Sequence, residues 1–326
     1  MDEKKKKRRR LPSWLRWTLW VLLFQLVLIN ISASIYAYRL THFTVSQSAD
    51  ASHSGKNIFS KTWKLFTGPH YLRPAIKDKP SYAYDTVQLT TQNGTVIDAW
   101  YAQADSTARG TVILFHGVGA SKGLMLPEAA AFRQFGYNVF LVDFRGHGNS
   151  AGNSTTMGMR ETEEVKLAYA YIQQRGEKTI ILWGASMGAV VLAKAVGEYS
   201  LTPAALILEM PFSSLQSHLK ARARVLGFPQ QPFAFLVTGW IGLEQGYNGY
   251  RHSAVRYAKK INCPVLMQYG EKDPYVLREE VDEIYNALAS PEKSKAGYPN
   301  AWHESLVNND GELWEKEVTA FLKGLR

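Results

Sequence analysis

A serine flanked by two glycines, Gly184-Ala185-Ser186-Met187-Gly188, stands where an apolar run ends and a helical stretch begins. Glycine weakens a helix or a strand by about 0.5–1 kcal/mol relative to alanine, so two glycines at this junction indicate a steric requirement. A sharp strand-to-helix turn imposes one, because strand and helix approach each other closely beside the residue at the tip. The pattern predicts that Ser186 is held in a strained conformation on such a turn, with Gly184 and Gly188 leaving room for it.

Short apolar runs alternate with helical stretches over most of the chain. The runs cover residues 111–116, 137–143, 179–184, 204–210 and 264–270. Nearly continuous apolar runs of this length are typical of strands buried on both faces of a parallel sheet. Two strand-like segments joined at Asn93-Gly94 precede them and predict an antiparallel hairpin. This order predicts a single α/β domain over residues 81–326, with a mostly parallel, doubly wound sheet.

Residues 211–260 interrupt the alternation of strand and helix and are rich in aromatic side chains. We expect this segment to be a small helical cap insertion over the carboxyl ends of the strands, where it would shape an apolar pocket. Ordinary packing of these helices on the sheet is the alternative.

The chain begins with a basic segment that is followed by an uncharged apolar one. Residues 1–16 contain eight Lys or Arg against two acidic residues, and residues 17–38 carry no charge and include 17 apolar side chains. A helix of that length measures roughly 33 Å, enough to cross a hydrocarbon core of about 30 Å. We therefore predict a single-pass transmembrane signal anchor at 17–38, with residues 1–16 in the cytoplasm. Residues 39–80 would be a linker, and the catalytic domain would lie on the periplasmic, lumenal or extracellular side.

This N-terminal segment has two other interpretations. A cleaved signal peptide also has a basic start and an apolar run, although its run is usually shorter. The basic run could also be a nucleic-acid or nuclear-localisation patch. The apolar segment directly behind it argues against that role. Of the formal charge of +10, residues 1–16 carry +6, which leaves only +4 for the rest of the chain. We expect no nucleic-acid partner.

A serine nucleophile needs a base, and the base needs a third group that orients it. For a serine on this kind of turn the expected order along the chain is serine, acid, histidine. The histidines after Ser186 are His218, His252 and His303, and the first two fall in the predicted cap insertion. Only His303 follows the last predicted strand, so we predict that His303 is the base.

The acid is expected just beyond the end of a parallel strand, where ligands meet such sheets. Asp273 follows the predicted strand at 264–270 and is the first candidate for orienting His303. Glu209, at the end of the preceding strand, is the second candidate, and Glu271 is the third.

A developing oxyanion requires backbone N–H donors close to the serine. His116-Gly117-Val118-Gly119 directly follows a predicted strand, so we predict that the Val118 and Met187 amides form the oxyanion hole. His116 is interpreted as a structural residue that holds this loop. Asp143 and His147 could suggest a metal site, but two residues without further ligands are weak evidence. We expect no metal and no cofactor.

Six segments together resemble the α/β-hydrolase superfamily, namely HGVG, DFRGHGNS, GASMG, EMPFSSL, GEKDPYV and AWHESL. The resemblance covers about residues 84–325. It is to membrane-anchored serine hydrolases related to lysophospholipases, monoacylglycerol lipases and prolyl-oligopeptidase-like proteins. It implies an α/β-hydrolase fold with Ser186 as nucleophile, Asp273 as acid, His303 as base and the two amides as oxyanion hole. Trp302 departs from the family, which often has glycine before the histidine, and this leaves the range of substrates open.

These observations predict a serine hydrolase that cleaves an ester or thioester through an acyl-enzyme, without a cofactor. The aromatic insertion and the membrane helix favour an acyl or lipid-like substrate. A serine peptidase of the same fold is one alternative, and a non-catalytic binding protein that retains this fold is another.

Overall fold

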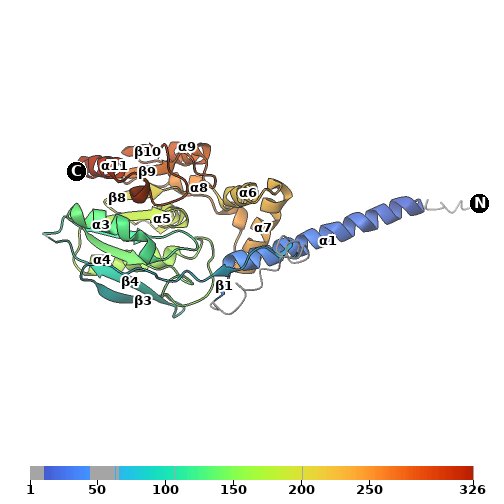
Figure 1. Ribbon diagram of the computed structural model, residues 1–326, viewed down its shortest axis with the longest axis horizontal. Coiled ribbons are helices and arrows are strands. Elements are labelled where there is room, and N and C mark those ends of the chain that lie inside the picture. The colour runs from blue at the N-terminus through green and yellow to red at the C-terminus, as the bar shows by residue number, and fades with distance from the viewer. Residues whose placement is uncertain (1–10, 45–62, 64–65, 106, 200, 326) are drawn as a thin grey trace, which may run out of the picture.

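The computed structural model describes residues 11–44, 63, 66–105, 107–199 and 201–325 (Figure 1). In this part of the chain an eight-stranded sheet has the order β10-β9-β8-β7-β5-β6-β4-β3. Its strands are β3 (Asp85–Thr90), β4 (Val96–Ala102), β5 (Thr111–Phe115), β6 (Asn138–Val142), β7 (Ile180–Ala185), β8 (Ala205–Glu209), β9 (Val265–Gly270) and β10 (Lys293–Tyr298). Every neighbouring pair is parallel except β3–β4 and β4–β6, so the prediction of a mostly parallel sheet is confirmed.

Helices cover both faces of this sheet. One face carries α4 (Thr162–Gln174), α5 (Met187–Tyr199), α8 (Ala254–Ala258) and α9 (Arg278–Ala287). The opposite face carries α3 (Leu126–Gln134), α10 (Leu306–Asn309) and α11 (Gly311–Gly324). Both sets bury apolar side chains against the strands, which explains why the strand sequences are apolar without alternation. The doubly wound arrangement is therefore confirmed.

The two ends of the sheet differ in how well the sequence predicts them. The expected hairpin is present, since β3 and β4 pair antiparallel around a turn in which Gly94 has a φ of +82°. β10 was not expected. Its sequence, Lys-Ser-Lys-Ala-Gly-Tyr, is largely polar, and it pairs with β9 at the edge of the sheet. An edge strand is partly open to solvent and needs no continuous apolar run.

Residues 211–260, here called the cap segment, contain α6 (Leu215–Val225), α7 (Gln230–Gln245), the short helix η2 (Gly249–Arg251) and α8. Ser214 caps α6 by accepting a hydrogen bond from the Ser217 amide, and α7 ends at Gly246 in the left-handed region. α6 and α7 lie beside each other and beside the N-terminal helix (Figure 1), whereas α8 packs on α5. The segment thus combines helices that stand off the sheet with one that belongs to its helical layer.

The N-terminal helix α1 (Ser13–Thr41) is longer than the predicted span of 17–38. By length and composition the helix is able to cross a membrane. Residues 17–29 are exposed and project away from the domain (Figure 1). Nearer its C-terminal end, Ala33, Tyr36, Ala37 and Leu40 pack against α7.

The residues after α1 are described only in part. β1 (Phe43–Thr44) pairs in parallel with β2 (Tyr71–Leu72), which ties this stretch into a short two-stranded sheet. Residues 1–10 of the predicted basic tail and 45–62 of the predicted linker lie outside the described residues. Because α1 continues to Thr41 and packs on α7, the residues from 39 to 41 are helical rather than part of a linker.

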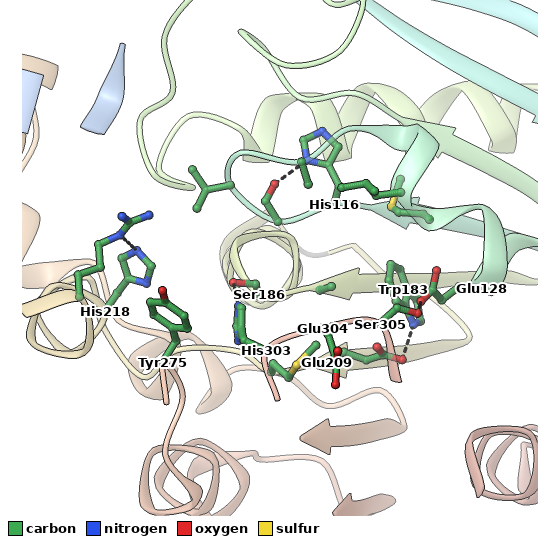
Figure 2. Close-up of a pocket in the computed structure, with 18 residues that line it drawn as sticks. His116, Glu128, Trp183, Ser186, Glu209, His218, Tyr275, His303, Glu304 and Ser305 are labelled. Atoms are coloured by element: carbon green, nitrogen blue, oxygen red, sulfur yellow. Dashed lines mark hydrogen bonds between the residues drawn. The ribbon is translucent and has the colours of Figure 1, made fainter. Parts of the chain in front are cut away.

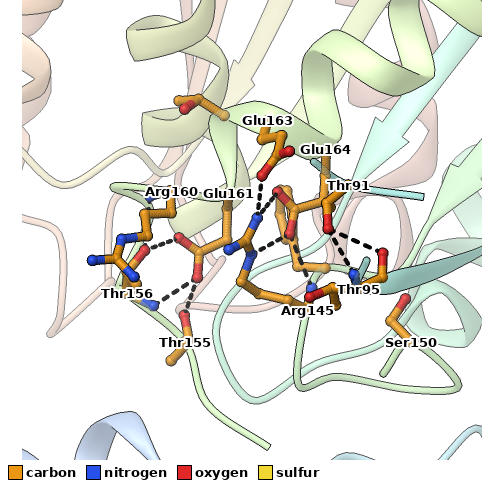
Figure 3. A network of polar contacts seen from close by, with 12 residues as sticks. Thr91, Thr95, Arg145, Ser150, Thr155, Thr156, Arg160, Glu161, Glu163 and Glu164 are labelled. Carbon is orange, nitrogen blue, oxygen red and sulfur yellow. Dashed lines mark hydrogen bonds and ion pairs between the residues drawn. The ribbon is translucent and has the colours of Figure 1, made fainter. Parts of the chain in front are cut away.

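Charged side chains fasten the loop that follows β6 to the start of α4 (Figure 3). Arg145 donates to Glu164 at 2.6 Å and to Glu163 at 2.9 Å. Glu161 accepts hydrogen bonds from the Thr155 hydroxyl and the Thr156 amide, both at 2.7 Å. Burial by itself raises the pKa of Glu161, but these hydrogen bonds and the charge of Arg145 outweigh burial and hold that pKa below its ordinary value. The loop is therefore fixed by a carboxylate that stays ionised.

A buried lysine joins two other parts of the fold. Lys122, in η1 (Lys122–Met125), is fully buried, and its Nζ contacts Asp98 of β4 and Asp143 at 2.5 Å. The Lys122 amide also donates to Asp143 at 2.6 Å. Buried charges are tolerated only when they are paired, so these two carboxylates depend on the one ammonium group.

We predict that Lys122→Met destabilises the protein by about 3–5 kcal/mol, because it leaves two buried carboxylates without their cation. The measurement is the free energy of unfolding from denaturant titration in detergent micelles. Lys260→Met, at an exposed position, is the matched control and should change stability by less than about 0.5 kcal/mol. Equal effects of the two substitutions would contradict the assignment of Lys122 as the residue that holds these segments together.

Candidate active site

Ser186 occupies the turn between β7 and α5, and its backbone has a φ of +53°, in the left-handed region. Space around this turn is limited. A Cβ on Gly184 would lie 2.8 Å from the carbonyl carbon of Gly188, and one on Gly188 would overlap the carbonyl oxygen of Phe115. The two glycines therefore let β7, α5 and β5 come together around a serine in a conformation that L-residues rarely adopt.

The structure brings Ser186 together with His303 and Asp273 (Figure 2 shows the first two). The His303 Nε2 lies 3.0 Å from the Ser186 Oγ, and the His303 Nδ1 lies 2.6 Å from Asp273 Oδ2. The other oxygen of Asp273 accepts hydrogen bonds from the Tyr275 and Val276 amides. With Nδ1 facing the carboxylate, Nε2 is free to accept the serine proton, which is the arrangement that activates a serine hydroxyl.

The alternative acids and bases lie elsewhere. Glu209 accepts hydrogen bonds from the indole N–H groups of Trp183 and Trp314, and Glu271 is exposed. His218 accepts a hydrogen bond from the Arg222 Nε, and burial lowers its pKa well below the ordinary value. His252 contacts the Met157 carbonyl and the Tyr257 hydroxyl. Of the residues considered from the sequence, Asp273 is the acid that contacts His303.

The loop after β5 passes directly beside the serine. A Cβ on Gly117 would stand 3.2 Å from the Cβ of Ser186, and Val118 lines the same pocket. Met187 is the first residue of α5, so its N–H has no acceptor within the helix. The two amides that the sequence analysis selected as an oxyanion hole thus both belong to segments adjoining the serine.

Two neutral histidines hold that loop. His116 is buried, burial lowers its pKa to about 4, and its Nε2 accepts a hydrogen bond from the Phe144 amide while Nδ1 donates to the Gly117 carbonyl. His147 accepts from the Gly119 amide, and its pKa falls to about 3, chiefly through burial. The prediction that His116 is a structural residue is confirmed by these contacts.

The metal alternative for Asp143 and His147 has a different explanation in the structure. Asp143 pairs with Lys122, and His147 bonds two backbone groups, so both side chains are engaged within the fold. Within the described ranges, no group of three or more His, Cys, Asp or Glu side chains is arranged to hold a metal ion.

A pocket of about 300 Å³ opens beside Ser186 and His303 (Figure 2). His218 and Tyr275 lie on one side of these two residues, and Trp183, Glu209, Glu128 and Ser305 lie on the other. α6 supplies His218 and Arg222, so the cap segment forms part of the wall. Trp302 does not line this pocket and is 57% exposed. Its bulk therefore faces solvent, not the predicted base.

Sequence reasoning missed the two carboxyl groups at the inner side of this pocket. Glu209 appeared only as a second choice of acid, and Glu128 of α3 did not appear at all. Burial, with the charge of Glu128 adding to it, raises the pKa of Glu209 to about 8, and burial raises that of Glu128 to about 6. No sequence pattern marks Glu128, a residue of helix α3, as part of the pocket. Its neighbours there come from distant parts of the chain, namely β8 and the segment after β10.

The chain matches one protein family and several known proteins. A family model described as serine aminopeptidase, S33, matches residues 106–242 and 245–310. The lysophosphatidylserine lipase ABHD12 of Danio rerio is 28% identical over 206 residues, which cover 61% of this chain and 52% of that protein. Protein bem46 of Schizosaccharomyces pombe is 26% identical over 232 residues, which cover 70% of this chain and 73% of that protein. The chain thus spans about half the length of the ABHD12 relatives that it matches.

A solved structure shows the same architecture. The esterase Pf2001 of Pyrococcus furiosus superposes with a TM-score of 0.66 and 26% identity, covering 78% of this chain and 96% of that chain. The expected α/β-hydrolase fold is confirmed.

The raised pKa of Glu209 predicts how stability depends on pH. The carboxyl holds its proton more tightly in the folded than in the unfolded chain, so its contribution is complete below the ordinary value of 4.5 and is lost as pH rises through about 8. Glu128 of α3 and Tyr298 of β10 are the titratable groups that face it. Glu209→Gln retains an acceptor oxygen for the two indoles but cannot ionise.

We expect the thermal midpoint of the wild type to fall relative to that of Glu209→Gln as pH increases from 5 to 9. The measurement is thermal unfolding across this range, with Glu304→Gln, a change at an exposed carboxyl, as control. Parallel curves for the wild type and Glu209→Gln would show that Glu209 does not take up its proton on folding.

Proposed function

Because the chain belongs to the serine aminopeptidase S33 family, we propose that it is a membrane-anchored serine hydrolase that cleaves a carboxylic ester or thioester. The observation that carries this proposal is the hydrogen-bonded series from Ser186 through His303 to Asp273. The names of its relatives, a lysophosphatidylserine lipase and an esterase, support an ester as the substrate.

The proposed reaction proceeds in two halves. His303 takes the proton of Ser186 as the serine oxygen attacks the ester carbonyl, and Asp273 stabilises the imidazolium that forms. The Val118 and Met187 amides hold the oxyanion of the tetrahedral intermediate. The intermediate collapses to an acyl-enzyme as the leaving alcohol or thiol takes the proton from His303. Water, activated by His303, then attacks the acyl group and releases the acid and the free serine.

The cap segment and α1 favour a lipid-like substrate. α6 lines the pocket with His218 and Arg222 and ends in Val225 and Leu226, which are 44% and 48% exposed. The turn between α6 and α7 lies on the side of the domain toward which α1 projects (Figure 1). If α1 spans a bilayer, this apolar turn faces the membrane surface, and one helix links that surface to the pocket. The basic residues before α1 favour an N-terminus in the cytoplasm and a domain on the opposite side.

The description of the family favours a second candidate, an aminopeptidase that uses the same nucleophile. Amide and ester cleavage share the acyl-enzyme, so the three side chains do not distinguish between them. A binding protein that uses this fold without catalysis is the third possibility, and the hydrogen-bonded set of Ser186, His303 and Asp273 argues against it.

We predict that the purified protein reacts with a fluorophosphonate probe and hydrolyses short-chain 4-nitrophenyl esters. Ser186→Ala should abolish labelling, and Ser186→Ala and His303→Ala should each lower kcat at least about 10³-fold, because either change removes the activated nucleophile. Labelling by gel fluorescence and ester hydrolysis by absorbance are the measurements, and short peptides with a free N-terminus are assayed in parallel.

Ser294→Ala and His70→Ala change the same residue types at exposed positions and should leave both readouts unchanged. Wild-type protein that is folded by circular dichroism but neither labels nor turns over any substrate would leave the binding protein as the better explanation. Peptide cleavage faster than ester cleavage would favour the aminopeptidase.

Membrane anchoring is tested separately. The full-length protein should remain in the membrane pellet after alkaline extraction, whereas a Leu22→Arg, Phe24→Arg variant should be released. Both side chains are exposed on α1, and a charge at the centre of a span costs about 2.5–3.5 kcal/mol. Leu277→Arg, outside α1, is the control and should stay in the pellet. Release of the wild type by alkali would contradict a retained anchor.

A further inference from the structure

The inner end of the pocket carries two carboxyl groups that the proposed reaction does not use. Glu209 is the last residue of β8 and is fully buried, and Glu128, in the first turn of α3, is 2% exposed. Both line the pocket that contains Ser186, and they lie on the side of Ser186 away from His218 and Tyr275 (Figure 2).

Each carboxyl group is only half satisfied. Glu209 Oε1 accepts hydrogen bonds from the Trp183 and Trp314 indoles at 2.9 and 2.7 Å, and Glu128 Oε1 accepts one from the Ser305 hydroxyl at 2.5 Å. The second oxygen of each, Oε2, is buried and has no hydrogen-bond partner among the described residues. Such groups are rare, because an unpaired buried polar atom costs about as much as a lost hydrogen bond.

Several elements of the fold hold these carboxyl groups in place. The three donors that fix the Oε1 atoms come from β7, α11 and the segment after β10, so three elements orient the two side chains. Glu304, also at this pocket, differs in that it is exposed and accepts hydrogen bonds from the Trp302 amide and the Asn309 side chain. Among the described residues that line this pocket, the buried oxygens without a partner therefore belong to Glu128 and Glu209.

The protonation states of the two carboxyl groups indicate which kind of ligand group they can bind. With pKa values of about 8 and about 6, Glu209 keeps its proton at neutral pH while Glu128 is largely ionised. The pair therefore offers both a donor and an acceptor. A hydroxyl group can satisfy both at once, since it donates one hydrogen bond and accepts others.

We infer that Glu128 and Glu209 form a polar subsite that binds a hydroxyl group on the arm of the ester that enters the inner end of the pocket. This inference rests on the proposed hydrolysis at Ser186 and specifies its substrate further, as an ester that bears a hydroxyl group. An alkyl chain in the same place leaves both Oε2 atoms unpaired. Sites built to bind a substrate hydroxyl discriminate strongly against analogues that lack it.

The experiment compares substrates that differ only by replacement of a methyl by a hydroxyl. On the alcohol side the pair is butyl butyrate and 3-hydroxypropyl butyrate, and on the acyl side it is the 4-nitrophenyl esters of heptanoic and 6-hydroxyhexanoic acid. The wild type is expected to prefer the hydroxylated member of at least one pair by tenfold or more in kcat/KM. Glu128→Met should bring that ratio close to one by weakening the hydroxylated and improving the alkyl substrate. Glu128→Gln, which remains polar, should retain part of it.

Glu283→Met is the matched control, because it removes an exposed carboxyl of α9 that does not line the pocket, and it should keep the wild-type ratio. The rate of fluorophosphonate labelling is recorded for every variant to show that the serine is still reactive. A wild-type ratio near one for both pairs, with normal labelling, would overturn the subsite and leave a carboxyl pair with a structural role only. A complete lack of labelling and ester turnover would instead overturn the proposed function.

Discussion

The close approach of three backbones around Ser186 is the constraint on which the rest of this structure depends. The first turn of α5 lies against the end of β5, and the position of Gly188 is compatible with that contact only because it has no side chain. The same contact places the loop after β5, with Gly117 and Val118, next to the serine. A single steric condition thus fixes the conformation of the serine and the position of the amides beside it.

The loops around the site are held by charges and neutral imidazoles taken into the interior. Lys122 joins β4 to the end of β6, Arg145 joins the next loop to α4, and His116 and His147 bond backbone groups of neighbouring loops. Burial keeps both imidazoles uncharged at neutral pH, so their hydrogen bonds do not change with modest acidification. These contacts fix the loops around the site, and a site built on loops needs such support to keep its reacting groups at fixed distances.

The sequence predicts those features that depend on local pattern. Continuous apolar runs identify the five central strands, and the order of Ser186, Asp273 and His303 follows from where strands end. Features that depend on tertiary neighbours cannot be predicted from the sequence. β10 is polar because it lies at an edge, and α1 extends past residue 38 because Ala37 and Leu40 pack on α7. Glu128 and Glu209 lie 81 positions apart, and only the folded arrangement of α3 and β8 brings them to one pocket.

The separation of 117 residues between Ser186 and His303 has a consequence for the order in which the protein is made. At about 5–20 residues per second, the ribosome would add His303 about 6–23 s after Ser186. During that interval the serine is present on the nascent chain without the imidazole that receives its proton. Strand β9, which leads to Asp273, is also made after Ser186. The growing chain therefore has no activated hydroxyl until its later part has been translated and has folded back onto the sheet.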